Sequence, residues 1–295
     1  MINHLFKYLL MTVLMIVMIF FNLFGPYYLT FLFPNNNKMS LGIQYWYLGA
    51  DIYRDLQSIN ETGFKTIKIH LDCDTINYFG GPNNDTDLFY RIVKEYYNFK
   101  ITVIVWYDDL DKLDYYLERW GKYVTYIQVL NEPDVSSAWT LPGAVYIDEE
   151  IYTLTETIVQ KVRAYNSSIG LYTNLTPGIL LRSNLPGFFS NITDFLGLDI
   201  YMDSGLRFSP FIYSSMKKLS NNKEIIISEF GICDNDDTRQ ADYIIEGLNF
   251  FKNYGIKECW LMCWGGQGSW VGEGYNIGGR LAQQRIKEWI QQNGS

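Results

Sequence analysis

The chain has 295 residues, of which 48% are hydrophobic and 17% aromatic, and its formal net charge is −8. A chain of this length and apolar content can form one large or two ordinary domains with a substantial core. The negative charge argues against nucleic acid as a partner, because phosphate binding needs clustered Lys and Arg. The histidines, His4 and His70, are too few for a histidine-rich metal site, and the four cysteines include no Cys-x-x-Cys pair, so we expect no metal and no cofactor.

The N-terminal segment is apolar. Residues 8–24 carry no charge and follow Lys7, and the apolar character extends to Phe33. Such a stretch can cross a bilayer of about 30 Å. We expect residues 1–33 to be a transmembrane signal anchor that exports the remainder to the cell surface, because the positive charge precedes the apolar segment. A cleaved signal peptide is the alternative, although no small-residue cleavage site follows.

Residues 34–39 are a polar linker, and residues 40–295 are expected to form a separate domain in which strand-like and helix-like segments alternate. Strands that alternate with helices form parallel βαβ units, and eight units close a (β/α)8 TIM barrel. The rival is an open doubly wound sheet, which carries a glycine-rich phosphate loop after its first strand; residues 45–50 contain no such loop. Strands are expected at 42–47, 65–72, 100–107, 124–132, 169–174, 194–202, 224–230 and 258–264, and helices at about 51–62, 86–98, 109–122, 147–166, 178–190, 208–221, 238–254 and 279–292.

Two glutamates stand at the ends of expected strands. The apolar run from Thr125 stops at Asn131-Glu132-Pro133. Because proline cannot join a sheet ladder and favours an extended residue before it, this strand is expected to end at Glu132. The run Glu224-Ile-Ile-Ile-Ser-Glu-Phe-Gly231 delivers Glu229 in the same way. The C-terminal strand ends form the active face of a barrel, so the two carboxyl groups are expected to meet there.

Other expected strand ends are polar or aromatic. A set of acidic groups walled by aromatic rings suits sugars, whose C–H faces stack on rings while their hydroxyls bind polar groups. In so aromatic a chain, part of this set is equally expected to pack in the barrel or under loops. Strand alternation predicts that Trp264 faces the barrel mouth, and that Cys259 and Cys263 point to the helices. The candidate substrate-binding residues are Trp46, Lys68, His70, Trp106, Asn131, Tyr201 and Trp264.

The motifs together resemble those of clan A glycoside hydrolases. The resemblance rests on Asn131-Glu132-Pro133, on Ser228-Glu229-Phe230-Gly231, on Gly63-Phe-Lys-Thr-Ile-Lys-Ile69 and on Trp264, and it covers about residues 40–292. It implies a retaining double displacement, with Glu132 as acid/base and Glu229 as nucleophile. It also implies that Asn131 binds the sugar 2-hydroxyl and that Trp264 floors the subsite of cleavage. Such catalysis needs carboxyl groups roughly 5–5.5 Å apart, and the acid is expected to have a raised pKa.

The chain departs from the cellulase-like family of that clan at two kinds of position. Lys68 stands where that family has an arginine that holds the nucleophile, and lysine supplies charge without a bidentate fork. Lys68 could instead face the helices. Tyr107 and Tyr201 stand where that family tends to have histidines, and Tyr201 is a candidate hydrogen-bond partner of Glu229. His70 is either a subsite contact or a plain barrel residue.

The expected function is therefore that of a membrane-anchored retaining β-glycosidase acting on a carbohydrate substrate. A transglycosidase that uses the same covalent intermediate is the second enzyme reading. A non-catalytic glycan-binding surface protein is a third reading, against which the retention of Glu132, Glu229 and Asn131 argues, because a binding module has no need for this trio.

Overall fold

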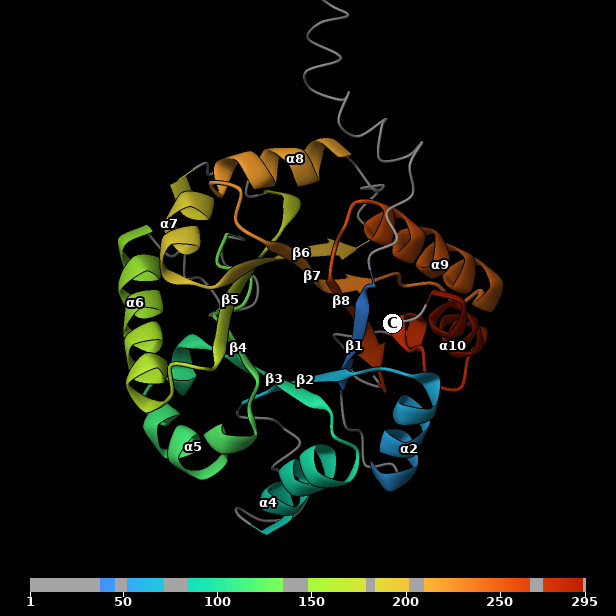
Figure 1. Ribbon diagram of the computed structural model, residues 1–295, viewed down its shortest axis with the longest axis horizontal. Coiled ribbons are helices and arrows are strands. Elements are labelled where there is room, and N and C mark those ends of the chain that lie inside the picture. The colour runs from blue at the N-terminus through green and yellow to red at the C-terminus, as the bar shows by residue number, and fades with distance from the viewer. Residues whose placement is uncertain are drawn as a thin grey trace, which may run out of the picture.

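The computed structural model describes residues 38–45, 52–71, 84–134, 148–178, 184–201, 210–265 and 273–293. Within these ranges eight parallel strands form a closed barrel in the order β1 to β8, which confirms the expected TIM barrel. Figure 1 shows the helices as an outer ring around the strands. The anchor expected over residues 1–33 lies outside the described residues. No described helix has both the length and the hydropathy that crossing a membrane requires.

The strands are short and follow the expected positions closely. They are β1 (Ser40–Tyr45), β2 (Thr66–His70), β3 (Lys100–Val105), β4 (Tyr126–Val129), β5 (Gly170–Leu175), β6 (Phe195–Tyr201), β7 (Ile225–Gly231) and β8 (Glu258–Trp264). The helices are α2 (Ile52–Thr62), α4 (Asn84–Arg91), α5 (Leu113–Trp120), α6 (Asp148–Tyr165), α7 (Asn184–Ile192), α8 (Pro210–Leu219), α9 (Asp237–Asn253) and α10 (Leu281–Asn293).

The two faces of each strand bury different kinds of side chain. Outward-facing aliphatic residues such as Ile43, Val103 and Leu196 are fully buried in the layer between strands and helices. This layer forms because successive side chains of a strand point to opposite faces, so every second residue meets the amphipathic helices.

The barrel interior is aromatic at its lower level. Trp260 and Tyr172 are fully buried there, their ring centroids 5.2 Å apart, and Ile226 completes the cluster. The indole needs space from β1, because a Cβ on Gly42 would lie 2.2 Å from Trp260 Cδ1. This packing fills the barrel below the strand ends and leaves the polar residues of the interior at the C-terminal ends, here called the mouth.

Candidate active site

The chain that follows β4 carries Glu132 in an unusual backbone conformation. The expectation that the strand runs to Glu132 with extended geometry is wrong: β4 ends at Val129, and the φ angles of Leu130 and Glu132 are 62° and 43°. Non-glycine residues in this left-handed region cost about 1–3 kcal/mol unless the surroundings hold them. Here the Glu132 backbone N–H donates to Asn174 Oδ1 at 2.9 Å. A contact from β5 thus overrides the local preference set by Pro133.

Asn131 is held by its own side-chain oxygen. Its Oδ1 accepts hydrogen bonds from Gln128 Nε2 at 2.8 Å and from Asn174 Nδ2 at 2.9 Å. Gln128 is fixed in turn by the Tyr172 hydroxyl, which donates to its Oε1 at 2.8 Å. Both bonds to Asn131 use the oxygen, so its amide nitrogen is the group that can donate to a ligand.

Glu229 reaches the mouth through an irregularity in β7. Leu198 of β6 pairs with Ile227, whereas the next residue, Asp199, pairs with Glu229, so Ser228 is an extra residue. A bulge of this kind lets two successive side chains serve one face. Ser228 Oγ accordingly donates to Asp199 Oδ1 inside the barrel, and the neighbouring Glu229 carboxylate, 5% exposed, also lies inside.

Lys68 and Tyr201 hold the Glu229 carboxylate from two sides. Lys68 is fully buried, and its Nζ lies 2.6 Å from Glu229 Oε1 and 3.2 Å from the Ser228 carbonyl oxygen. The Tyr201 hydroxyl donates to Glu229 Oε2, as the sequence predicted. Lys68 therefore faces the mouth and not the helices. A lysine is almost never fully buried unless it is paired, and Glu229 is the carboxylate with which Lys68 pairs.

Glu132 lies in surroundings that favour its neutral form. Burial, the negative charge of Glu229 and that of Asp134 raise the pKa of Glu132 to about 8, while a hydrogen bond with Asp199 and the charge of Lys68 act against the rise. Glu132 therefore carries a proton at neutral pH, as the sequence led us to expect for one of the two glutamates. The electrostatic effect of Glu229 on Glu132 indicates that the two carboxyl groups share one environment.

Asp199 is a third carboxyl group that the site prediction missed. It is fully buried, its Oδ2 accepts a hydrogen bond from Asn174 Nδ2 at 2.5 Å, and its pKa is raised well above the usual range by burial and by the charges of Glu229 and Glu132. We call Glu132, Asp199 and Glu229 the acidic cluster. Asp199 lies two residues before Tyr201 on the same strand, and alternation puts two such residues on the same face, so the expected position of Tyr201 at the mouth implied the same position for Asp199.

His70 and Trp106 form a pair at the ends of β2 and β3. Trp106 Nε1 donates to His70 Nδ1 at 2.7 Å, and the two rings are stacked with centroids 5.5 Å apart. Burial and the charge of Lys68 lower the pKa of His70 to about 3, so the imidazole is neutral at physiological pH. The indole fixes the imidazole by using its Nδ1 as the acceptor. Trp46, the other predicted aromatic wall residue of this side, lies outside the described residues.

Trp264 does not take the predicted place on β8. Gln44 of β1 pairs with Met262 and Tyr45 with Trp264, so Cys263 is an extra residue and the alternation reverses after it. Trp264, 4% exposed, packs in the hydrophobic layer outside the strands, where a Cβ on Gly278 would lie 2.8 Å from its indole. The prediction that Trp264 floors a sugar subsite is therefore wrong.

Met262 is the β8 side chain that lies beside the acidic cluster, with its Sδ 3.0 Å from the Tyr201 hydroxyl. The peptide bond between Met262 and Cys263 is cis. Cys259 packs in the outer layer as predicted. Cys263 is the extra residue of β8 and is buried, and its thiol donates to the Gly265 carbonyl oxygen at 3.2 Å; burial and, to a smaller extent, the charge of Glu229 raise its pKa.

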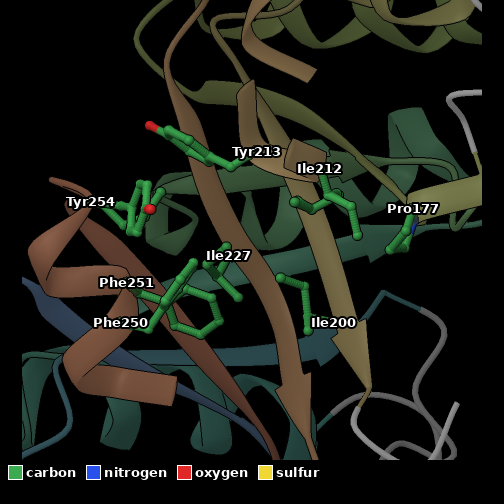
Figure 2. Close-up of a pocket in the computed structure, with 10 residues that line it drawn as sticks. Pro177, Ile200, Ile212, Tyr213, Ile227, Phe250, Phe251 and Tyr254 are labelled. Carbon is green, nitrogen blue, oxygen red and sulfur yellow. The ribbon is translucent and has the colours of Figure 1, made fainter. Parts of the chain in front are cut away.

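Metal-binding groups and one apolar cavity are further features to consider within the described residues. No group of three or more His, Cys, Asp or Glu side chains within the described ranges is arranged to hold a metal ion. A cavity of about 20 Å³ lies outside the barrel between β6, β7, α8 and α9, which is room for about one water molecule. Figure 2 shows its lining, which is apolar apart from the hydroxyls of Tyr213 and Tyr254.

No family model and no curated protein matches the sequence. The structure, however, is similar to solved structures of glycoside hydrolases. A β-glycosidase, BGL167, superposes with a TM-score of 0.62 and 10% identity, covering 81% of this chain and 85% of that chain. A psychrophilic family 10 endo-β-1,4-xylanase gives 0.59 and 14%, with 85% and 96% covered.

An endo-β-1,4-mannanase from Thermotoga petrophila gives a TM-score of 0.59 and 12% identity, covering 88% of this chain and 77% of that chain. Identities this low establish similarity of fold alone. The resemblance to clan A glycoside hydrolases that the sequence motifs indicated is confirmed at that level: this chain folds into the closed parallel barrel that these glycoside hydrolases share.

Proposed function

We propose that the protein is a retaining β-glycosidase in which Glu132 is the acid/base and Glu229 the nucleophile. The observation that carries the proposal is the contrast between the two glutamates. The pKa of Glu132 is raised to about 8, whereas Glu229 forms a 2.6 Å ion pair with the buried Lys68. Retaining glycosidases need one neutral and one ionised carboxyl group that face the same bond.

The reaction follows from these protonation states. A Glu229 oxygen attacks the anomeric carbon, the bond to the leaving oxygen breaks, and Glu132 gives its proton to that oxygen. The sugar is then held as an ester of Glu229, and Glu132 is a carboxylate. In the second step Glu132 takes a proton from water, the water oxygen attacks the anomeric carbon, and the ester bond breaks. Both glutamates end in their starting states.

The neighbouring side chains suit supporting roles in these steps. Lys68 and the Tyr201 hydroxyl bind the two oxygens of Glu229 and aim its carboxylate. The Asn131 amide nitrogen would donate to a sugar hydroxyl beside the anomeric carbon, since the Asn131 Oδ1 already accepts from Gln128 and Asn174. The stacked pair of His70 and Trp106 offers an aromatic surface to a sugar ring, which binds such faces through its C–H groups.

Substitution of each glutamate tests the two roles separately. Glu229→Ala should abolish turnover, and azide should restore part of it with inverted stereochemistry. Glu132→Ala should slow poor leaving groups roughly 10²–10⁴-fold but activated aryl groups far less, since these depart without a proton. In that variant azide should give the retained product. Glu288→Ala, at an exposed carboxylate on α10, is the matched control and should behave as wild type.

A panel of β-linked polysaccharides identifies the substrate class. Release of reducing ends from one of them supports hydrolysis, whereas longer oligosaccharides in mass spectra indicate transfer to a sugar acceptor. Binding of a polysaccharide with no cleavage, unchanged in both alanine variants, would contradict the enzyme assignment and indicate a glycan-binding protein.

We also propose the division of the chain into an anchor (1–33), a linker (34–39) and the barrel domain (40–295), with the barrel exported. The uncharged run 8–24 after Lys7 supports this. Expression of the full chain tests it: the protein should stay with membranes after alkaline washing and be open to protease from the outside. Release into the wash, or protection from external protease, would contradict the anchor or the orientation.

A further inference from the structure

The acidic cluster has fewer positive charges than carboxyl groups. Lys68 is the cation that the described structure places against it, and the Lys68 ammonium pairs with Glu229. Glu132 and Asp199 are linked through Asn174, which accepts from the Glu132 backbone N–H and donates to Asp199 Oδ2, and no described ion pair includes either carboxyl group. Two carboxylates that lie close together in a buried site repel each other strongly, so at least one of them holds a proton.

The surroundings of Asp199 suit a neutral carboxylic acid. The side chain is fully buried, and its described hydrogen-bond donors are both uncharged: Ser228 Oγ on Oδ1 and Asn174 Nδ2 on Oδ2. Neutral donors orient a carboxyl group without balancing its charge, and an isolated buried charge is far more costly than a buried acid.

The hydrogen-bond pattern also indicates which oxygen of Asp199 holds the proton. Asn174 is oriented by its Oδ1, which accepts from the Glu132 backbone N–H at 2.9 Å, so its Nδ2 points to Asp199 Oδ2 as a donor. In a protonated carboxyl group, the oxygen that accepts a hydrogen bond from a fixed donor is the carbonyl oxygen, which does not carry the proton. Oδ1 faces the Ser228 hydroxyl, which can either donate or accept. Oδ1 is therefore the oxygen that can hold a proton.

We propose that Asp199 is a positioning residue that stays protonated and donates a hydrogen bond from Oδ1 to the Glu132 carboxylate. The part played by Glu132 in catalysis rests on the proposed function, whereas the protonation of Asp199 does not. When Glu132 gives its proton to the leaving group, the new carboxylate finds a donor already in place. Asp199 keeps its own proton throughout, so no net proton transfer passes through it.

This donor offsets an environment that otherwise holds the Glu132 proton too tightly. Burial and the charges of Glu229 and Asp134 all favour neutral Glu132, and the bond to Asp199 and the charge of Lys68 oppose them. An acid/base that cannot release its proton is as ineffective as one that cannot keep it. The described titratable or charged groups that face the pair are Lys68, Asp134, Tyr172, Tyr201 and Glu229.

Asp199→Asn and Asp199→Ala separate a neutral donor from a negative charge. In Asp199→Asn the amide oxygen can accept from Asn174 while the amide nitrogen, in the place of Oδ1, donates to Glu132 without a charge. Asp199→Ala removes the donor. The readout is the ¹³C NMR titration of Glu132 in protein labelled at glutamate side-chain carboxyl carbons, assigned with Glu132→Gln.

We expect the Glu132 midpoint of Asp199→Asn to stay within about 0.5 pH unit of wild type, and that of Asp199→Ala to rise by about 1 unit or more, because a hydrogen bond to the charged form is lost. A fall of about 1 unit in either variant would show that a negative charge had been removed, and an unchanged midpoint in Asp199→Ala would show that no donor had been lost; either result overturns the proposal. If the alanine variant does not fold, the asparagine variant alone still decides between a donor and a charge.

The basic limb of the pH profile of kcat/KM should shift in parallel with the Glu132 midpoints. A merely structural role of Asp199 would not produce this parallel shift. If no glycoside is cleaved at all, the NMR midpoints still test the protonation of Asp199, so failure of the proposed function and failure of this inference give different results.

Discussion

Replacing Lys68 with methionine removes the cation of the acidic cluster and keeps a side chain of similar length. Glu229, 5% exposed and 2.6 Å from Lys68 Nζ, then loses its ion-pair partner inside the barrel. Removing one member of a buried ion pair costs about 3–5 kcal/mol of stability. Since each kcal/mol lowers the melting temperature of a domain of this size by about 2–4 °C, we expect a fall of at least about 6 °C.

Urea unfolding followed by tryptophan fluorescence measures this loss. The double variant Lys68→Met with Glu229→Gln should regain much of the stability, because no unpaired charge is left. Lys161→Met removes a surface ion pair with Asp114 and is the control, expected to change stability by less than about 1 kcal/mol. A Lys68→Met protein as stable as this control, or a double variant no more stable than the single one, would refute the account of the cluster's charge.

Three further predictions concern stability. The pKa of Glu132 is raised from 4.5 to about 8 in the folded protein, so the folding stability of the wild type falls as the pH rises from 4.5 to 8. Glu132→Gln lacks this titration, so it should be more stable than wild type by about 2–4 kcal/mol at pH 8 and equally stable near pH 4.5. Equal stability of the two proteins at both pH values would contradict the raised pKa. Gly42→Ala should cost at least about 1–3 kcal/mol in urea unfolding, because its Cβ would meet Trp260 at 2.2 Å, whereas Gly187→Ala, with its nearest contact at 3.7 Å, should not. Asp236→Ala should cost about 1 kcal/mol through loss of the α9 N-cap, whose side chain accepts two backbone N–H groups, and a change within error would show that water replaces the cap.

The barrel was predictable because its signals are local. Strand and helix patterns alternate from residue 40 onward, and each strand lies within a few residues of its expected position. The same reasoning placed Glu132 and Glu229 at the mouth, and the resemblance to the cellulase-like family suggested Tyr201 as the hydrogen-bond partner of Glu229. Parallel strands in a closed barrel end on the same side, so a residue at a strand end needs little further information to be located.

The errors arose where the strand pattern is interrupted by an extra residue. Nothing in the letters around Cys263 marks a bulge, yet the register shift between Met262 and Trp264 exchanges the inner and outer faces of β8. Likewise the left-handed conformation of Glu132 depends on Asn174, which is distant in sequence. Asp199 was visible as a strand residue, but its importance depends on which neighbours are charged, and only the three-dimensional arrangement gives that.

The aromatic layer beneath the mouth determines from which side water and protons can reach the acidic cluster. Trp260 and Tyr172 are fully buried and close the barrel below the acidic cluster, so water and protons reach the carboxyl groups from the open end. A sugar ring seated over Glu229 would cover that end. In the double displacement proposed above, the acidic cluster would then exchange few protons with bulk solvent while the glycosyl ester exists, so the water molecule that enters would be both the nucleophile and the source of the proton that Glu132 recovers.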